Sequence, residues 1–433
     1  MFNINNRGNL LQLNRIIYPV FLISIVSLLT LYFSNNFTIT DTSTVFFKQF
    51  IFIILGTIGY LVISKIDYEL LKFWQILLIL YLVTIVLLVI TIIIGEARGN
   101  AVRWIEVGGI QIQPSEIAKY TTIFLSAYIM EKLRYAEWIK ILISISVALP
   151  IIVLIYIQPS GSIALITLVL LAITIFMYIK NKLGALVLVL ISIFNILGFV
   201  LIVLGQIIGY LLIVLGIIAV IFAFFSALGI QKSSIIIYVI TVILGLVISS
   251  STNYIWNNIL EDHHRNRITT YIQEMSGQSA SSDLQWQVDQ SKITIGSGQL
   301  FGKGWGNGTQ STRMFLPEHN TDFIFASYSE QTGLIGVLVL FALYALLFIF
   351  IIYNLYLKKL GDFEIAIVTV LLFKILIEMS INLGTNTGII PPTGIPLPFM
   401  SYGGTITLLS FFSLGLIQSI IDRNSIDNRN ILN

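Results

Sequence analysis

The amino-acid sequence predicts an all-α integral membrane protein that crosses the bilayer many times. Hydrophobic residues make up 57% of the 433 residues, charged residues only 10%, and the mean hydropathy is +0.93. A soluble domain needs far more polar surface than this composition supplies. Apolar runs long enough to cross the hydrocarbon core of a bilayer, about 30 Å, recur along the chain. The absence of cysteine excludes disulfides and thiolate metal sites, and the net charge of +3 gives no reason to expect a nucleic-acid partner.

We expect twelve membrane spans. They lie near residues 16–33, 49–64, 74–94, 117–130, 139–157, 163–179, 185–204, 207–228, 235–250, 330–354, 364–384 and 403–421. The first span is too long for the apolar region of a signal peptide, so we expect the protein to retain it. The two apolar runs between residues 179 and 232 carry almost no polar residues, which is typical of a lipid-facing hairpin without a site.

The basic residues predict the orientation of these spans. With twelve spans, the lysines and arginines of the short connections fall on one side: Arg7, Arg15, Lys65, Lys72, Lys132, Arg134, Lys140, Lys180, Lys182, Lys232, Lys358, Lys359, Arg423 and Arg429. Because basic residues concentrate on the cytoplasmic side, we place both termini there. The segments 95–116, 251–329 and 385–402 then face outward, and we expect residues 251–329 to form an ordered extracytoplasmic loop region.

One outward segment crowds acids, a histidine and an amide against the start of a span. It reads Leu-Pro-Glu-His-Asn-Thr-Asp-Phe-Ile-Phe over residues 316–325. A carboxylate at Asp322 would lie near the lipid boundary, where partial desolvation raises a pKa and suits a general base. The alternative is a helix N-cap, since Asn320, Thr321 and Asp322 are all good capping residues. The residues alone leave both readings open.

A second outward segment, residues 101–119, leads into another span. Arg103 and Trp104 suit a partly amphipathic segment at the membrane interface. Pro114 can open a helix, which places Glu116 in the first turn and Lys119 three residues further on the same face. Charged residues inside a span are costly unless they are paired or face a cavity, so this pair marks a functional interior or a structural ion pair between helices.

The long loop offers further cations. The basic residues Arg265, Arg267, Lys292, Lys303 and Arg313 face outward against the usual tendency, which suits phosphate or pyrophosphate groups, although nearby acids also allow a solvated, neutralised loop. Adjacent histidines at 263 and 264 point to different faces and do not predict a metal site. The glycine-rich stretch 296–308 lacks the pattern of a nucleotide-binding loop, so we expect it to bend over a flat ligand or lie along the membrane.

A third outward segment, residues 391–404, contains four prolines and three glycines and cannot form a regular helix. Broken backbone at membrane depth is tolerated only where protein or a cavity covers it. Just upstream, Lys374 and Glu378 lie four residues apart on one helix face, which predicts another intramembrane pair. These features indicate a polar groove that opens toward the outer face.

Three of these motifs resemble the SEDS family (shape, elongation, division and sporulation). They are QPSEIAK at 113–119, LPEHNTDFIFA at 316–326 and PPTGIPLPFMSYGG at 391–404. The three motifs occur in the family's order and on one expected face of the membrane. The resemblance covers about residues 10–425, and we expect residues 1–433 to form a single membrane domain. Residues 258–268 and 290–310 are more similar to the rod-shape branch, RodA, than to the division branch, FtsW.

The resemblance implies a peptidoglycan glycosyltransferase of the bacterial cytoplasmic membrane. Such an enzyme polymerises lipid II, the undecaprenyl-pyrophosphate-linked disaccharide peptide, beside a class B penicillin-binding protein transpeptidase. It implies that Asp322 is catalytic, that Glu116 and Lys119 are an intramembrane charged pair, and that Arg267 is the basic residue of the outer loop. We add the other expected substrate-binding residues: Arg103, Lys303, Glu318 and Ser401. No residue requires a cofactor or metal, although a divalent cation, Mg²⁺ or Mn²⁺, could assist the pyrophosphate.

The sequence departs from the family pattern in three places. Asn320 stands where the family has a histidine, and His319 lies one position earlier. Residues 158–162 read Gln-Pro-Ser-Gly-Ser where a carboxylate is usual. The family has about ten core spans, so residues 183–228 would be an inserted hairpin. Alternatives to elongation-specific polymerisation are a lipid II flippase or transporter, a division-branch polymerase, and a non-catalytic scaffold for the transpeptidase.

Overall fold

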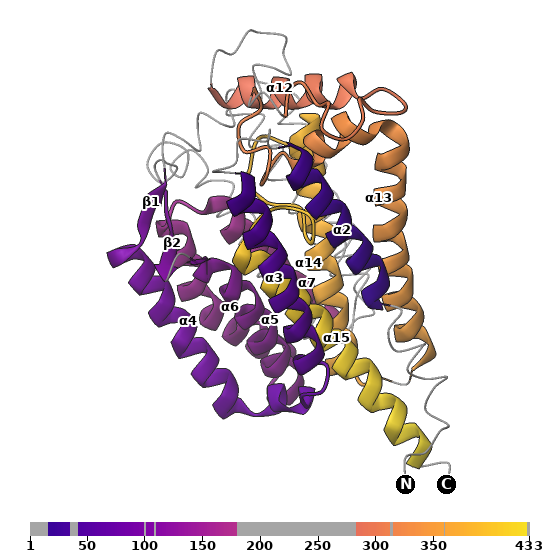
Figure 1. Cartoon of the computed structure of the whole chain (residues 1–433). Helices are drawn as coiled ribbons and strands as arrows, with labels where there is room; N and C mark the ends of the chain where they lie inside the picture. The colour runs from indigo at the N-terminus through magenta and orange to yellow at the C-terminus, as the bar shows by residue number, and fades with distance from the viewer. Residues whose placement is uncertain are drawn as a thin grey trace, which may run out of the picture.

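A computed structural model describes residues 16–34, 42–98, 101–107, 110–179, 283–311, 315–358 and 360–430 (Figure 1). These residues form ten α-helices, one short 3-10 helix and a small sheet. The helices are α2 (Ile17–Ser34), α3 (Thr42–Ile63), η3 (Tyr68–Lys72), α4 (Trp74–Ile94), α5 (Pro114–Lys132), α6 (Glu137–Ile157), α7 (Gly161–Tyr178), α12 (Asp283–Ser297), α13 (Ile324–Leu357), α14 (Asp362–Thr387) and α15 (Gly404–Asn430).

The helical membrane fold is confirmed. Within the described residues, seven helices are long and apolar enough to cross a membrane: α2, α3, α4, α6, α7, α13 and α15. Two more helices, α5 and α14, match the expected spans at 117–130 and 364–384. With the seven helices above, nine of the twelve expected spans therefore coincide with helices. The spans expected at 185–204, 207–228 and 235–250, and the hairpin at 183–228, lie outside the described residues.

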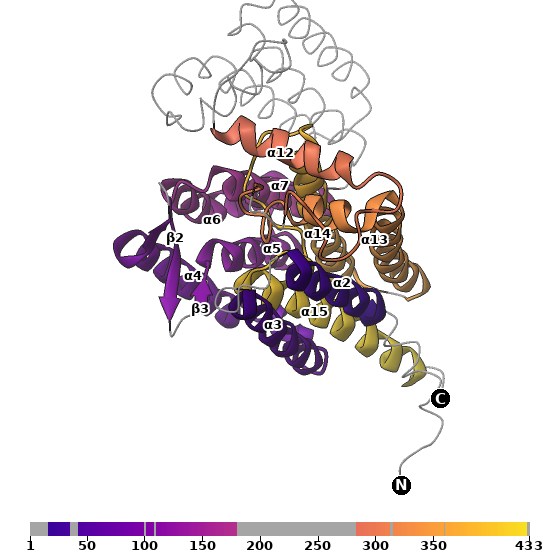
Figure 2. The ribbon, with the colours of Figure 1, turned by 45° about the horizontal axis from the view of Figure 1, so that its top comes forward.

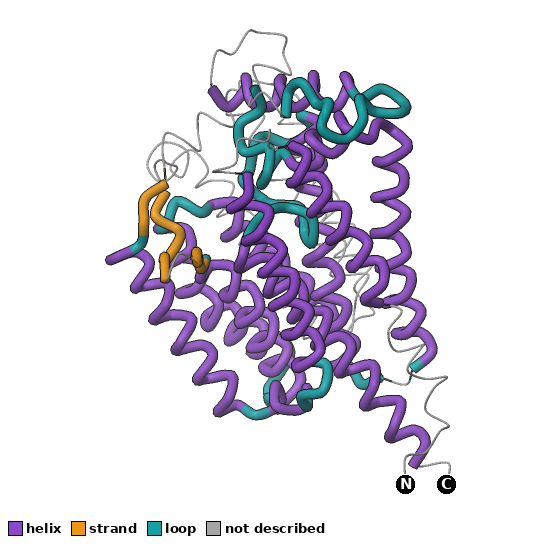
Figure 3. Tube along the Cα trace, viewed as in Figure 1, coloured by secondary structure: helices purple, strands orange, loops and turns teal. Residues whose placement is uncertain are grey.

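The chain runs back and forth along the bundle, so its connections gather at two ends. The connections after α3, α5 and α13 meet at one end, and those after α4, α6 and α14 meet at the other. The second end carries α12, which lies across the bundle above several loop segments (Figures 1 and 3). In the view of Figure 2, α5 and α14 lie among the other long helices, most of which are drawn below α12. The three sequence motifs therefore meet at the α12 end.

The segment expected to be an interfacial loop contains a sheet instead. Strands β1 (Glu96–Arg98), β2 (Ala101–Val107) and β3 (Ile110–Ile112) pair antiparallel in the order β1-β2-β3. Backbone N–H and C=O groups near a bilayer need partners, and short antiparallel hairpins supply them without a helix. The sheet joins the end of α4 to the start of α5.

Small residues let α3 and α15 pack closely. A Cβ atom added to Gly59 would lie 1.9 Å from a ring carbon of Phe412, and one added to Gly56 would lie 2.8 Å from the ring of Phe411. Without a solvent-driven hydrophobic effect inside a bilayer, such close van der Waals packing holds helices together. This contact fixes the helix that follows the proline-rich segment.

The glycine-rich stretch bends over a break in α13, which differs from our expectation of a ligand or membrane surface. Gly333 has φ 66° and interrupts α13, so neighbouring backbone groups lack helical partners. The stretch supplies them: Leu334 N–H donates to Gln299 O (2.9 Å), and Lys303 N–H donates to Glu330 O (2.9 Å). The sequence shows the glycines but not the helix break that they complement.

Candidate functional site

The site forms where the segment before α13 meets the proline-rich segment before α15. Tyr402 N–H donates to the carbonyl of Asn320 (2.9 Å). The hydroxyl of Ser401 donates to the carbonyl of Thr321 (2.6 Å) and accepts the N–H of Leu397 (2.8 Å). Residues some 80 positions apart are thus joined backbone to backbone, and Ser401, expected to bind substrate, has its hydroxyl in these internal bonds.

The backbone of Asp322 is held from α14. The side-chain amides of Asn382 and Asn386 both donate to the carbonyl oxygen of Asp322, at 2.8 and 2.9 Å. Asn382 also donates to the carbonyl of Ile395 (2.8 Å), in the proline-rich segment. Both asparagines are fully buried. No sequence motif singles them out, although their spacing of four after Lys374 and Glu378 continues one polar face of the helix.

Asp322 does not occupy the N-cap of α13. The cap position belongs to Phe323, whose side chain makes no cap hydrogen bond among the described residues. The free N–H of Ala326 in the first turn instead donates to Oδ1 of Asn386 (3.2 Å). The side chain of Asp322 is part-exposed, and a Cβ atom added to Gly394 would lie 3.6 Å from its Oδ2. The capping interpretation of Asp322 is therefore wrong for α13, and its role as a general base stays a prediction.

The QPSE motif contributes to a buried ion cluster. Lys119 Nζ lies 2.8 Å from Glu116 Oε2 and 2.5 Å from Glu378 Oε1, and Lys374 Nζ lies 2.9 Å from Glu378 Oε2. All four side chains are at most 4% exposed. Two acids and two lysines leave the cluster neutral, and the ring of Tyr120 lies 5.2 Å from Lys374 Nζ. The cluster joins α5 to α14, as the structural alternative for Glu116 and Lys119 requires.

The cluster lies close beneath the segment that carries Asp322. Lys374, Glu378, Asn382 and Asn386 follow one another at four-residue intervals, so they share one face of α14. At 1.5 Å per residue, Glu378 lies about 6 Å along the helix from Asn382. One helix face therefore connects the ion cluster to the backbone of Asp322.

The other expected site residues make contacts of their own. Arg103 donates to the carbonyl of Pro159 and so holds the turn between α6 and α7. Lys303 Nζ lies 2.7 Å from Glu330 Oε1. Exposed Glu318 accepts the hydroxyl hydrogen of Thr321 (2.8 Å). Arg267 lies outside the described residues.

His319 is buried beside the same turn. Its Nδ1 lies 3.2 Å from the carbonyl of Leu316, and its own carbonyl accepts the hydroxyl of Ser327 (3.1 Å). Burial lowers the pKa of His319, because the charged imidazolium would lose its hydration. The ring is therefore neutral at physiological pH and packs beside the turn that precedes Asp322.

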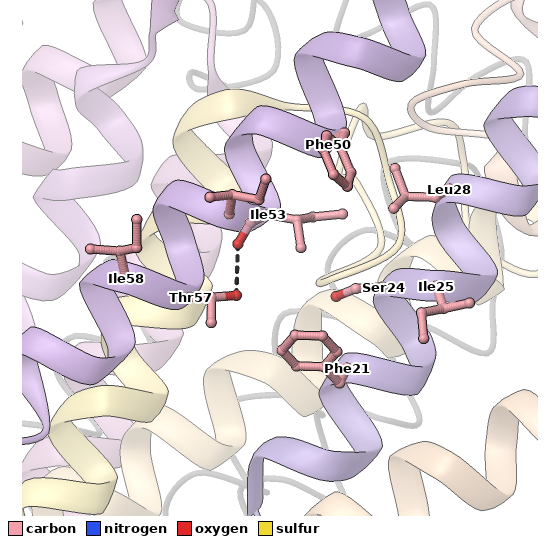
Figure 4. A pocket seen from close by; sticks show the side chains of 9 residues that line it. Phe21, Ser24, Ile25, Leu28, Phe50, Ile53, Thr57 and Ile58 are labelled. Carbon is pink, nitrogen blue, oxygen red and sulfur yellow. Dashed lines mark hydrogen bonds between the residues drawn. The ribbon is translucent and has the colours of Figure 1, made fainter.

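An apolar groove of about 270 Å³ runs between α2 and α3 (Figure 4). Its lining consists of Phe21, Ser24, Ile25, Leu28, Phe50, Ile53, Ile54, Thr57 and Ile58. Thr57 donates its hydroxyl to Ile53 O, whereas the buried hydroxyl of Ser24 has no hydrogen-bond partner in the part of the chain described. The groove therefore suits a hydrocarbon chain better than a sugar or a phosphate.

The same two helices hold the proline-rich segment. Ser27 on α2 donates its hydroxyl to the carbonyl of Met400. Gln49 on α3 donates to Ser401 O (3.3 Å) and accepts from Gly403 N–H (3.1 Å). Since Ser27 and Gln49 lie within one turn of groove residues, the groove and the Asp322 segment share a support. Within the described residues, no group of three or more histidines and acids is placed to hold a metal ion.

This arrangement defines a class: a helical protein with several membrane spans, a buried ion cluster between two helices and a part-exposed carboxylate directly before α13. Solved structures share the fold. A chain of a peptidoglycan synthase complex, described as coordinating polymerisation and crosslinking, aligns with TM-score 0.63 and 20% identity over 94% of this chain and 97% of its own. The rod shape determining protein RodA of Thermus thermophilus aligns with TM-score 0.56 and 16% identity over 94% and 96%.

The family model for FtsW, RodA and SpoVE, described as cell cycle proteins, matches residues 11–209 and 178–426. The chain belongs to this family, the SEDS family. Peptidoglycan glycosyltransferase MrdB of Escherichia coli K12 is 29% identical over 79% of this chain and 76% of its own. The probable peptidoglycan glycosyltransferase FtsW of Enterococcus hirae is 30% identical over 94% and 91%. RodA of Treponema pallidum is 28% identical over 87% and 89%, so both branches match at similar identity.

Proposed function

We propose that this protein is a peptidoglycan glycosyltransferase that polymerises lipid II at the outer face of the bacterial cytoplasmic membrane. The observation that carries the proposal is the placement of Asp322. Its side chain is part-exposed, directly before a membrane-crossing helix, on a segment held by α14 and by the proline-rich segment. A carboxylate in that place can reach a sugar whose lipid tail stays in the bilayer.

The proposed reaction is an inverting glycosyl transfer. Asp322 accepts the proton of the 4-hydroxyl of the acceptor sugar while that oxygen bonds to C1 of the donor sugar. The bond from C1 to the pyrophosphate oxygen breaks, and the polyprenyl pyrophosphate leaves with the bonding electrons. Arg267 and other cations of the outer loop would stabilise the charge on that leaving group. A bound divalent cation would serve the same purpose at the pyrophosphate, but no residue described here requires one.

The distribution of charge supports an outward orientation for this end. Lys65, Lys132, Arg134 and Lys140 lie at or near the connections of the opposite end, where α3 and α5 finish and α6 begins. Basic residues in short connections favour the cytoplasmic side. The Asp322 end then faces outward, and the C-terminal end of α15 lies toward the cytoplasm.

The groove between α2 and α3 supports a lipid-linked substrate. Its walls are hydrocarbon, both helices are apolar enough to cross a membrane, and its supports, Ser27 and Gln49, also hold the proline-rich segment. A polyprenyl tail in this groove would leave its headgroup near Met400 and Ser401. We propose that the groove takes part of that tail.

We further propose that the protein acts in cell elongation beside a class B penicillin-binding protein transpeptidase. Residues 258–268 and 290–310 support the elongation branch by their similarity to RodA. The related synthase complex, in which polymerisation and crosslinking are coordinated, supports the partner. If the protein acts in elongation, its depletion should produce round cells. If it belongs to the division branch, depletion should instead produce filaments with unfinished septa.

The proposal is tested with purified protein, fluorescent lipid II and the transpeptidase, present or omitted. Wild type should form glycan polymer. Asp322→Asn should bind lipid II but form no polymer. Glu69→Gln is the matched control, because Glu69 is an exposed carboxylate at the opposite end of the bundle. Polymer formation by Asp322→Asn at the wild-type rate would contradict the mechanism.

A transporter is the second candidate, because the buried ion cluster and the broken α13 are features of transport proteins. A flippase would move labelled lipid II between the leaflets of proteoliposomes without forming polymer. A scaffold would do neither and would still bind the transpeptidase. The polymer assay and a leaflet-accessibility assay on the same vesicles separate the three functions.

A further inference from the structure

We infer that Asn382 and Asn386 are positioning residues for Asp322, and that Asn386 also caps α13 from another helix so that the aspartate need not. The inference rests on the proposed function of Asp322 and adds to it. It assigns a role to two residues on α14 that lie 60 and 64 positions from the aspartate in sequence.

The first observation is that both amides converge on one acceptor. The carbonyl oxygen of Asp322 receives a hydrogen bond from each asparagine, at 2.8 and 2.9 Å, and so fills both lone pairs. Two donors from adjacent turns of one helix fix the position of that peptide more tightly than one donor could. The Cα atom of Asp322, and with it the origin of its carboxylate, is thereby set relative to α14.

The second observation concerns the first turn of α13. The first N–H groups of a helix lack internal partners, and a polar side chain at the N-cap usually satisfies one of them. Phe323 at this N-cap has no polar side chain, and Oδ1 of Asn386 accepts the N–H of Ala326 instead. If the helix began one residue earlier, Asp322 would be the cap.

This difference has a chemical consequence. A carboxylate at the N-cap accepts backbone hydrogen bonds and lies in the positive end of the helix dipole, both of which stabilise the anion and weaken it as a base. Because Asn386 caps the helix from outside, Asp322 can keep its side chain toward Gly394 in the proline-rich segment. The cap and the base are separate residues.

The third observation is that the asparagines have their full set of partners. The two hydrogens of Asn382 Nδ2 go to Asp322 O and Ile395 O, and those of Asn386 Nδ2 go to Asp322 O and Asn382 O. On its other side, the backbone carbonyl of Asn386 accepts the hydroxyl of Ser291 on α12 (2.9 Å). The pair therefore joins α12, α13 and the proline-rich segment at the base of the candidate catalytic residue.

The test uses near-isosteric variants so that no cavity confuses the result. Asn382→Leu and Asn386→Leu remove donors and acceptors but keep the branched shape and the number of heavy atoms, and Asn386→Asp keeps the acceptor for Ala326 N–H while removing the donors. Turnover is measured per lipid II-binding molecule, so that unfolded protein is not counted. Asn354→Leu is the matched control. Asn354 Nδ2 donates to the carbonyl of Phe350 four residues earlier (2.7 Å), as Asn386 Nδ2 does to the carbonyl of Asn382. Asn354, however, lies near the far end of α13 from Asp322.

We expect each leucine variant to lower kcat at least tenfold with KM for lipid II within about twofold, and Asn386→Asp to lose less than Asn386→Leu because the cap remains. Asn354→Leu should keep the wild-type kcat. Wild-type kcat in both leucine variants, or an equal loss in Asn354→Leu, would overturn the inference. So would losses that appear only in KM or in the thermal midpoint, which a merely structural role would produce.

The outcome separates this inference from the proposed function. If Asp322→Asn is inactive and the asparagine variants are fully active, the aspartate is the base but needs no positioning by α14. If Asp322→Asn is as active as wild type, the proposed mechanism itself fails.

Discussion

Removal of the Lys119 charge should destabilise the protein more than removal of any surface charge. Lys119 lies between two buried carboxylates, at 2.8 Å from Glu116 and 2.5 Å from Glu378, and is itself 1% exposed. Replacement by methionine keeps most of the volume but turns a neutral cluster of two acids and two lysines into one with a charge of −1. Breaking a buried pair by removing one partner costs about 3–5 kcal/mol, because the remaining charge is uncompensated.

The assay is thermal or denaturant unfolding in detergent, and the cluster itself supplies the control. Adding Glu378→Gln to Lys119→Met restores neutrality, so the double variant should be less destabilised than the sum of the single variants by at least about 1 kcal/mol. Arg423→Met tests an exposed pair, since Arg423 and its partner Asp67 are 41% and 38% exposed, and should cost at most about 1 kcal/mol. A Lys119→Met protein as stable as wild type would refute the reasoning.

Three further predictions concern the site. Gly394→Ala should reduce polymerisation severalfold with lipid II still bound, because φ +69° strains an alanine by about 1–2 kcal/mol and its methyl would touch the Asp322 carboxylate; unchanged rates would contradict this. Stability should fall as the pH drops below about 6.5, because the unfolded chain then takes up a proton that buried His319, with its lowered pKa, resists. His319→Gln should flatten that slope between pH 7.5 and 5.5, and an equally steep slope in the variant would disprove the assignment. Ile54→Trp should raise KM severalfold for lipid II with a full-length tail but leave KM for a short-tailed analogue unchanged. Leu55→Trp is the control, because Leu55 is equally exposed at 43% but lies outside the groove, and it should leave both KM values unchanged. Equal effects of the two variants would exclude the groove as a tail site.

The bilayer explains why so much of the fold could be predicted from the sequence. Every backbone group in hydrocarbon needs an internal partner, so an apolar run of sufficient length has little alternative to a helix. The cost of a buried charge likewise singles out Glu116, Lys119, Lys374 and Glu378 in the sequence alone. The sequence predicted two pairs, and the structure joins them into one cluster.

The remaining features depend on tertiary contacts that no local pattern encodes. The break at Gly333 and the glycine-rich stretch are complementary, but neither predicts the other along the chain. The sheet after α4 replaced an expected interfacial loop. Asn382 and Asn386 look like ordinary polar residues of a helix until the carbonyl of Asp322 is placed beside them.

The central claim is that the carboxylate of Asp322 takes the proton of the acceptor hydroxyl. Single-turnover transfer from bound lipid II, measured for wild type and Asp322→Asn at equal occupancy, tests this claim most directly. General-base catalysis contributes about 10²–10⁴-fold, so the account predicts a rate loss of at least a hundredfold in the chemical step with binding unchanged. A rate within a few-fold of wild type at full occupancy would contradict it.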